Sequence, residues 1–440
     1  MREHLANAAY GLMDYAAYPI GMLLVAPVVL RNMGAARYGE WAVTTAIVSM
    51  GSIIASGFGD AHIKHVAGQR GAGDMSALVR TVRCKVGINL ATGTILAAVA
   101  WMLAPYAASH LGATNAALQR ESLWSLRLAS IIILLRALEN VCISTQRAFE
   151  RYGAAVRISI LARVFSLIAA GFLAVVAHSV VALVVATVLL TLLGTWLQFS
   201  HLRRMLQTVT LSPVFDRTAF RALISFGAFT WIQAVAAVAF SQADRLLLGV
   251  SLGAGTVAAY ALCSQMAQPI YGLAAAGLHF LFPYLASRLP SHSQRQLRGA
   301  VLAAFAVNAL FIASSFAGLV VFGPRILHLW AGRSIAESSV SLLPLIGCSY
   351  ALAGLSVTAT YALTALGRVR VVTWLNLAGG AAMLLLMAWL LPRFGARGLA
   401  MARLSYGAVV LLLYLPLAFQ LKRKDAQKVS AISHVICEEA

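Results

Sequence analysis

The chain has 440 residues, of which 60% are hydrophobic and only 11% are charged. Soluble domains carry about 25% charged residues, so this composition excludes an ordinary water-soluble enzyme or binding domain. The net charge of +20 could indicate a nucleic-acid partner, but the 34 Lys and Arg residues lie scattered between apolar runs and form no continuous basic tract. Such scatter is typical of the loops of a multi-pass membrane protein.

Apolar runs of about 20 residues, the length that crosses ~30 Å of hydrocarbon, recur along the whole chain. We therefore predict an all-α, polytopic membrane protein with about twelve transmembrane helices. Their approximate ranges are 5–30, 41–57, 86–106, 123–144, 154–176, 180–199, 222–250, 256–284, 299–322, 339–366, 371–391 and 398–419. The first run is too long for a cleavable signal peptide and contains Asp14, so we expect it to be retained.

The longest interval between predicted spans lies halfway along the chain and divides it into two predicted lobes. We expect an N-terminal six-helix lobe at 1–205, a cytoplasmic linker at 206–221, a C-terminal six-helix lobe at 222–421 and a cytoplasmic tail at 422–440.

An internal repeat agrees with two lobes. Segments 33–67 and 252–286 align without gaps, and each runs from a small-residue turn through an aromatic-Ala-aliphatic triplet into an apolar run. Five of the 35 aligned positions are identical, among them Gly34 with Gly253. Duplication at half-length is typical of two-lobed transporters.

The positions of Lys and Arg predict the orientation of the chain, because the cytoplasmic side of a membrane protein is enriched in these residues. With the N-terminus inside, 22 of them fall on the inner face, Lys85 among these, and ten on the outer face. Both termini are therefore predicted to be cytoplasmic.

Charged residues within the apolar runs are the candidate functional residues, because a charge at the centre of a membrane helix costs about 2.5–3.5 kcal/mol. In the fourth predicted span, one helical face carries Arg136, Glu139, Asn140, Ser144 and Arg147. Two interpretations remain open. The face lines a wet cavity, or Arg136 and Glu139 form an internal pair whose polar neighbours seal an interface.

Three other spans carry polar residues at helical spacing. Tyr10, Asp14 and Tyr18 share a face of the first span, which fits either a cavity lining or side chains at the membrane boundary. Arg163 in the fifth span could pair with Glu139 or face a cavity. Gln268 in the eighth span indicates a weaker polar lining from the second lobe.

Enzyme chemistry has little support in the sequence. The chain has no large loop to carry catalytic carboxylates, only 14 Asp and Glu residues, and neither GxxxxGK[ST] nor HExxH. Its five cysteines show no CxxC or CxxH spacing and are typical of small buried hydrophobic residues. We therefore predict no catalytic residue, no cofactor and no metal site.

Several segments resemble the polysaccharide transport family, the Wzx-type oligosaccharide flippases of the MOP exporter superfamily. They are GAARYGEWAV at 34–43, GFGDAHIKHVA at 57–67, TQRAFERYG at 145–153, SQADRLLLG at 241–249, VAAYAL at 257–262 and TALGRVR at 364–370. The similarity extends from about residue 5 to residue 419, nearly the whole chain.

This resemblance implies two six-helix lobes, MATE-like, around a cavity that opens alternately to each side. Family members move undecaprenyl-pyrophosphate-linked sugar repeat units across the bacterial cytoplasmic (inner) membrane for O-antigen, capsule or exopolysaccharide assembly. The implied partners are that lipid-linked oligosaccharide, membrane lipids and a polysaccharide polymerase with its chain-length machinery.

The resemblance also implies roles for the candidate residues, carried over by position and charge. The basic residues among them suit pyrophosphate, the tyrosines and amides suit sugars, and the acidic residues suit cation coupling. The substrate-binding candidates are Arg136, Arg147, Arg163, Tyr10, Tyr18, Asn140 and Gln268, and the coupling candidates are Asp14 and Glu139.

Two alternatives remain. A MATE-like antiporter of cationic drugs would need acidic cavity walls, whereas the residues at mid-membrane depth include Arg136 and Arg163 beside Glu139. A membrane glycosyltransferase or polymerase would need the large loop that the sequence lacks.

Overall fold

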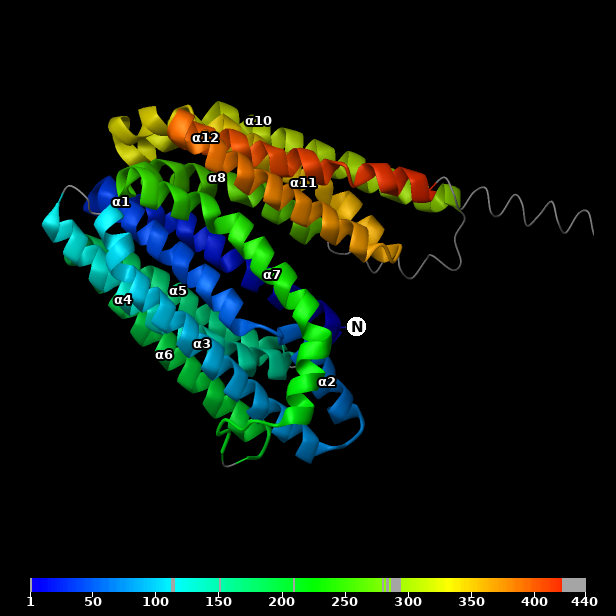
Figure 1. Ribbon diagram of the computed structural model, residues 1–440. Coiled ribbons are helices and arrows are strands. Elements are labelled where there is room, and N and C mark those ends of the chain that lie inside the picture. The colour runs from blue at the N-terminus through cyan, green and yellow to red at the C-terminus, as the bar shows by residue number, and fades with distance from the viewer. Residues whose placement is uncertain are drawn as a thin grey trace, which may run out of the picture. The chain divides into compact units, whose positions relative to one another are not determined.

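The computed structural model describes residues 2–421 except 112–114, 150–151, 209, 279–280, 282–284 and 286–293, and every regular element in this part of the chain is a helix (Figure 1). The helices are α1 (Arg2–Ser56), α2 (Gly59–Gly71), α3 (Met75–Leu111), α4 (Ala116–Ala148), α5 (Tyr152–Val176), α6 (Val180–Met205), α7 (Arg217–Leu252), α8 (Ala254–Leu278), α10 (Gln294–Val340), α11 (Leu343–Ala365) and α12 (Val369–Leu411). The predicted all-α class is confirmed.

Each of the twelve predicted ranges overlaps a helix, but 339–366 crosses the turn between α10 and α11, 398–419 crosses the turn after α12, and 256–284 includes residues outside the described part of the chain. By length and apolar composition, seven helices of the described residues qualify as membrane spans, or eight if Gly21–Ser56 and Ala61–Gly71 form one bent span. The seven cover eight of the predicted ranges, because Val369–Leu421 counts as one helix where we predicted two. The chain is thus polytopic, and twelve spans remains a prediction.

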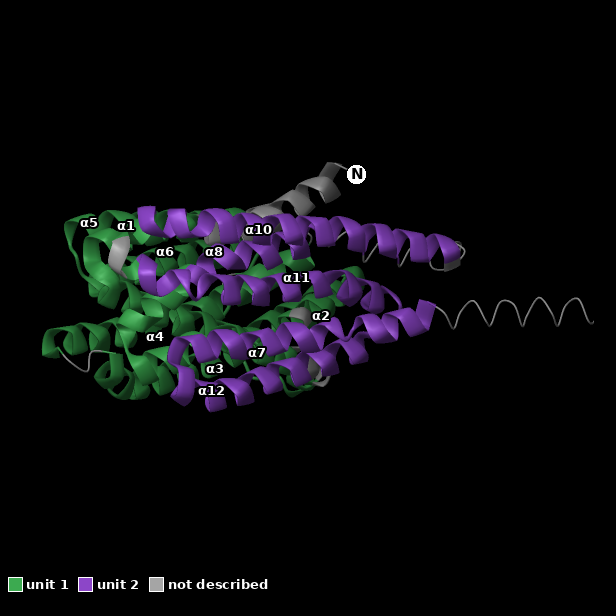
Figure 2. Cartoon of the chain, turned by 90° about the horizontal axis from the view of Figure 1, so that it is seen from above, with its two compact units in different colours: residues 1–262, 330–335 green, residues 263–329, 336–440 purple. Residues whose placement is uncertain are grey.

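The chain divides into two compact units, shown in Figure 2. Unit 1 comprises Met1–Leu262 with Trp330–Ile335, and unit 2 comprises Cys263–Leu329 with Ala336–Ala440. Unit 1 therefore includes α7, which packs against α1, α2 and α3. The predicted lobe boundary at 206–221 lies inside unit 1, so the division into two six-helix lobes stays a prediction.

The predicted linker is tied to the start of α3. Arg83 donates hydrogen bonds to the Ser212 carbonyl at 3.0 Å and to Ser212 Oγ at 2.7 Å, while the Val214 N–H donates to the Arg83 carbonyl at 3.3 Å. These contacts guide the chain from α6 to the first turn of α7.

Helix α4 is the central helix of unit 1, where it packs against α1, α2, α3, α5 and α6. Buried amides bind it to its neighbours. Asn89 of α3 donates to the Ala137 carbonyl at 2.6 Å, and Gln146 donates to Gln198 of α6 at 2.6 Å. Between apolar helices such hydrogen bonds add specificity that packing alone lacks.

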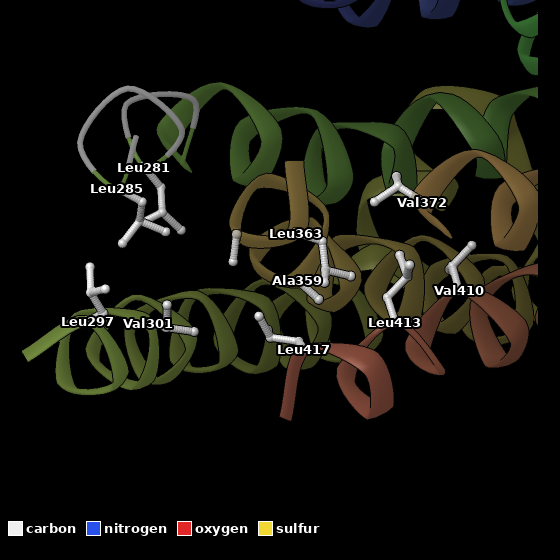
Figure 3. Packing of buried hydrophobic residues seen from close by; sticks show 11 residues of the cluster. Leu281, Leu285, Leu297, Val301, Ala359, Leu363, Val372, Val410, Leu413 and Leu417 are labelled. Atoms are coloured by element: carbon white, nitrogen blue, oxygen red, sulfur yellow. The ribbon is translucent and has the colours of Figure 1, made fainter. Parts of the chain in front are cut away.

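Unit 2 is organised around α11, which hydrogen-bonds to the residues around it. Asn308 of α10 donates to the Gly354 carbonyl at 3.0 Å, Tyr361 donates to the Ala275 carbonyl of α8 at 3.1 Å, and Tyr414 donates to the Leu355 carbonyl at 2.6 Å. Figure 3 shows the apolar cluster between these elements. Its buried members are Leu281, Leu285, Leu297, Val301, Ala359, Ala362, Leu363, Val372, Val410, Leu413 and Leu417.

Short polar side chains set where several helices begin, because they accept hydrogen bonds from the first free N–H groups. Asn115 caps α4 and Asp216 caps α7 in this way. Asp74, exposed between α2 and α3, accepts from the Ala77 N–H at 2.9 Å, and this bond lowers the pKa of its carboxyl.

Two glycines that the repeat aligns adopt the same rare backbone conformation. Gly34, within α1, has φ 82° and ψ 171°, and Gly253, between α7 and α8, has φ 79° and ψ 171°. This region is essentially restricted to glycine. The aligned positions therefore form the same tight turn between two helices, which supports the duplication.

Replacing either turn glycine with alanine is expected to destabilise the fold by about 1–3 kcal/mol. The cause is the backbone and not crowding, because an added Cβ at Gly34 would meet nothing within 4 Å and at Gly253 only the His110 carbonyl at 3.9 Å. Thermal unfolding of purified protein in detergent measures the effect. Gly255→Ala, in ordinary helix, is the matched control and should be neutral or slightly stabilising. Equal behaviour of all three variants would contradict the role of the turn.

Candidate functional site

The break between α1 and α2 is held by side chains from two other helices. Helix ends leave successive carbonyls without an intrahelical donor. Here, four consecutive carbonyls each accept a hydrogen bond from α3 or α7. The pairs are Trp231 Nε1 with the Ile54 oxygen at 2.9 Å, Thr92 Oγ1 with the Ala55 oxygen at 2.9 Å, and Lys85 Nζ with the Ser56 oxygen at 2.9 Å and with the Gly57 oxygen.

Lys85 carries the charge at this break and is fully buried. A cation at the carboxyl end of a helix is favourable because the peptide dipoles place partial negative charge there. Phe58 follows the break with a left-handed φ of 63°, its ring lies 5.7 Å from Lys85 Nζ, and it stacks on Trp231 with centroids 5.6 Å apart. Lys85 is thus bound by protein groups on several sides.

Lys85 is one of the cations that the sequence predicts on the inner face, and no other role is predicted for it. A signal was available, since Lys85, Asn89 and Thr92 recur at helical spacing, and each donates to a neighbouring helix. The stripe was missed because Lys85 precedes the predicted apolar run 86–106.

The polar face of α4 contains the ion pair that one of the two interpretations required. Arg136 Nη1 lies 2.7 Å from Glu139 Oε2, and the Glu139 side chain is only 3% exposed, against 20% for Arg136. Asn140 Oδ1 faces the start of α2, since a Cβ added at Gly59 would lie 3.6 Å from it. The pair does not exclude a cavity lining, because a guanidinium has five N–H donors and Glu139 binds one of them.

The polar face continues toward the end of α4. Buried Ser144 hydrogen-bonds within its own helix, to the Val141 carbonyl at 3.2 Å. Buried His62 of α2 hydrogen-bonds to Thr145 at 2.9 Å, and half-buried Arg147 lies in the last turn. Helix α2, which the sequence analysis did not predict as a separate element, therefore packs against this end of the face.

The remaining predicted site residues lie on α5, α8 and α1. Arg163 of α5 is half-buried and donates to Ser159 at 2.9 Å, so the ion pair of Glu139 is with Arg136. Gln268 is half-buried in α8, in unit 2. Tyr10, Asp14 and Tyr18 lie on the α1 helix, but their side chains lie outside the described residues.

Comparison with solved structures identifies the class of fold. An inward-facing multidrug resistance MATE family transporter of the MOP superfamily matches over 94% of this chain and 98% of its own, with 14% identity and a TM-score of 0.73. The lipid II flippase MurJ, in an inward closed conformation, matches over 94% and 87%, with 12% identity and a TM-score of 0.72. A MOP superfamily transporter from Pyrococcus furiosus Vc1 (DSM3638) matches over 93% and 96%, with 14% identity and a TM-score of 0.55. The protein thus has the fold of the MOP superfamily of membrane transporters.

The family follows from the sequence itself. Residues 28–340 match the family described as polysaccharide biosynthesis protein, and the chain belongs to this family. No curated protein matches the chain.

Proposed function

We propose that this protein is a flippase that moves undecaprenyl-pyrophosphate-linked oligosaccharide repeat units across the bacterial inner membrane, by alternating access, for surface polysaccharide assembly. Membership of the polysaccharide biosynthesis family carries the proposal, and the fold agrees with it, because one structure that shares the fold is a lipid II flippase. The protein would act as a transporter and not as an enzyme, with no cofactor and no catalytic metal.

The charges of unit 1 support an anionic cargo. Arg136 is partly exposed, and Glu139 accepts from only one of its guanidinium nitrogens. Half-buried Arg163 lies on the neighbouring helix α5. A guanidinium binds phosphate oxygens with two parallel N–H groups, which a pyrophosphate-linked lipid would use. We propose Arg136, Arg147 and Arg163 as the cationic contacts. Tyr10, Tyr18, Asn140 and Gln268 would contact the sugars.

The finer topology belongs to the same proposal. We propose twelve spans in two six-helix lobes, 1–205 and 222–421, with both termini cytoplasmic. The lipid tail would stay in the bilayer while the headgroup crosses between the lobes. A polymerase and its chain-length machinery would then use the flipped repeat unit.

A MATE-like drug antiporter is the second candidate, because a multidrug transporter shares the fold with a TM-score of 0.73, against 0.72 for the lipid II flippase. The two candidate functions differ in the charge that the substrate cavity requires. A cationic drug requires acidic residues in the cavity, whereas a pyrophosphate requires basic ones. Such a difference has a parallel in the Pyrococcus furiosus transporter of this fold, for which reverse polarity of the binding pocket is described as suggesting a different function.

Deletion of the gene is expected to abolish the surface polysaccharide and leave lipid-linked repeat units facing the cytoplasm. The sugars should then react with a membrane-impermeant oxidising reagent in inverted vesicles but not in right-side-out vesicles. Sugar transfer by the membranes should be unchanged, and the wild-type gene should restore export. Loss of sugar transfer would support an enzyme, and drug sensitivity with normal polysaccharide would support the antiporter.

A further inference from the structure

The segment of α1 that follows the Gly34 turn has Lys85 of α3 bound at its carboxyl end, at Ser56. A second buried ionisable residue, Glu40, lies near the other end of this segment, six residues after Gly34. Glu40 is fully buried, and neither of its carboxylate oxygens accepts a hydrogen bond from any described residue. An ionised carboxylate in such surroundings is strongly unfavourable unless an opposite charge compensates it. The neighbouring groups show whether the protein supplies that charge.

The nearest cation is already engaged. Arg37 Nε lies 2.9 Å from Glu121 Oε2, and the other Glu121 oxygen accepts the Val180 N–H at 2.7 Å. Among the described residues, Arg37 of α1 and Glu121 of α4 are the charged groups that act on Glu40, and the Val180 N–H belongs to the first turn of α6. With Glu40 ionised, one positive and two negative charges would leave the cluster with one excess negative charge, located at Glu40.

Buried hydroxyls complete the surroundings of Glu40. Thr44 lies one helical turn after Glu40, and Ser122 of α4 faces the same carboxyl; they are 2% and 0% exposed. Neither hydroxyl oxygen has a hydrogen-bond partner among the described residues. Ser125 also lies beside the carboxyl, but its hydroxyl donates to the Glu121 carbonyl at 2.9 Å. The two serine hydroxyls therefore lie near the Glu40 carboxyl, but neither forms a hydrogen bond to it in this structure.

We propose that Glu40, Thr44 and Ser122 form a site for a small monovalent cation, either a proton or a sodium ion, that neutralises the buried carboxylate. Carboxylate and hydroxyl oxygens are ligands that hard cations prefer, and a proton would let the carboxyl donate to a neighbouring oxygen. The site joins α1 to α4, so its occupancy would stabilise the packing of these two helices next to the Gly34 turn.

The inference extends the proposed transport function, since cation uptake at Glu40 is a means of coupling transport to an ion gradient. The coupling candidates predicted from the sequence are Asp14 and Glu139. Glu139 is paired with Arg136 at 2.7 Å and therefore has its compensating charge, whereas Glu40 does not. The structure thus favours Glu40 over Glu139 as the cation site.

The test uses purified full-length protein without any cargo, so its result is independent of the proposed cargo. Infrared difference spectra recorded across a pH titration detect a protonated carboxylic acid, and thermal unfolding in sodium chloride against choline chloride detects sodium binding. Glu40→Gln is nearly isosteric and neutral. Glu337→Gln, at an exposed position in α10, is the matched control.

For a proton, we expect a carboxylic acid band in the wild type and in Glu337→Gln that is lost in Glu40→Gln. For sodium, we expect a saturable rise in unfolding temperature in the same two proteins that is lost in Glu40→Gln. If neither signal depends on Glu40, the cation site does not exist, whether or not the deletion strain loses its polysaccharide. If Glu40→Gln does not fold, Thr44→Val and Ser122→Ala should each shift the frequency of the carboxylic acid band or weaken the stabilisation by sodium. A band and a sodium effect that are both unchanged in both variants would overturn the site.

Discussion

Lys85→Met is expected to lower the free energy of unfolding by about 2–5 kcal/mol, because it removes the shared donor of two buried carbonyls. The Ser56 and Gly57 oxygens would lose their hydrogen bonds at a place where α1 has already ended. Relief of the buried charge offsets part of this loss. The offset is incomplete because the ammonium is bound by two carbonyls and lies 5.7 Å from the Phe58 ring.

Three further variants distinguish the contribution of the Lys85 hydrogen bonds from that of its positive charge. Each is measured by thermal unfolding in detergent. Lys85→Gln keeps a donor without the charge and should recover part of the loss. Thr92→Val removes the hydroxyl that lies 2.9 Å from both the Ala55 carbonyl and the Ile88 carbonyl of its own helix, and should cost about 1 kcal/mol. Arg80→Met removes an exposed cation of the same helix and should have almost no effect. If Lys85→Met proved more stable than the wild type, desolvation of the ammonium would outweigh its hydrogen bonds.

The helices were predictable because their signal is local. Twenty apolar residues specify a membrane span whatever packs beside them, so each of the twelve ranges overlaps a helix of the described residues. The Gly34 and Gly253 turns were also within reach, since a repeat can be aligned before its conformation is known. The ion pair of Arg136 and Glu139 was one of the two interpretations that their spacing of three residues on a helix allowed.

Tertiary contacts were not predictable in the same way. Trp231 binds the Ile54 carbonyl across 177 residues of sequence, and this contact helps to place α7 in unit 1, beyond the predicted linker. Glu40 was overlooked for a related reason. It precedes the apolar run 41–57 and therefore resembles a loop residue, until α4 is seen to bury it.

Arg136→Ala is expected to reduce both the amount of protein in the membrane and its export activity. The Glu139 carboxylate, 3% exposed, would lose the partner that lies 2.7 Å away. Removal of one member of a buried ion pair typically costs about 3–5 kcal/mol, because the remaining charge is uncompensated. Immunoblots of membranes and the amount of surface polysaccharide measure the two effects separately.

The double variant Arg136→Ala/Glu139→Gln distinguishes a structural role from cargo binding. Glu139→Gln removes the stranded charge, so the amount of protein should return to near the wild-type level. Export should remain absent, because the cationic contact for pyrophosphate is still missing.

Arg136→Lys keeps the positive charge but loses the planar guanidinium that binds two phosphate oxygens at once, and partial export is expected. Glu139→Gln alone keeps Arg136 and should retain export. Recovery of both protein and export in the double variant would show that Arg136 serves only to neutralise Glu139, and the anionic cargo would then have to be bound by other residues.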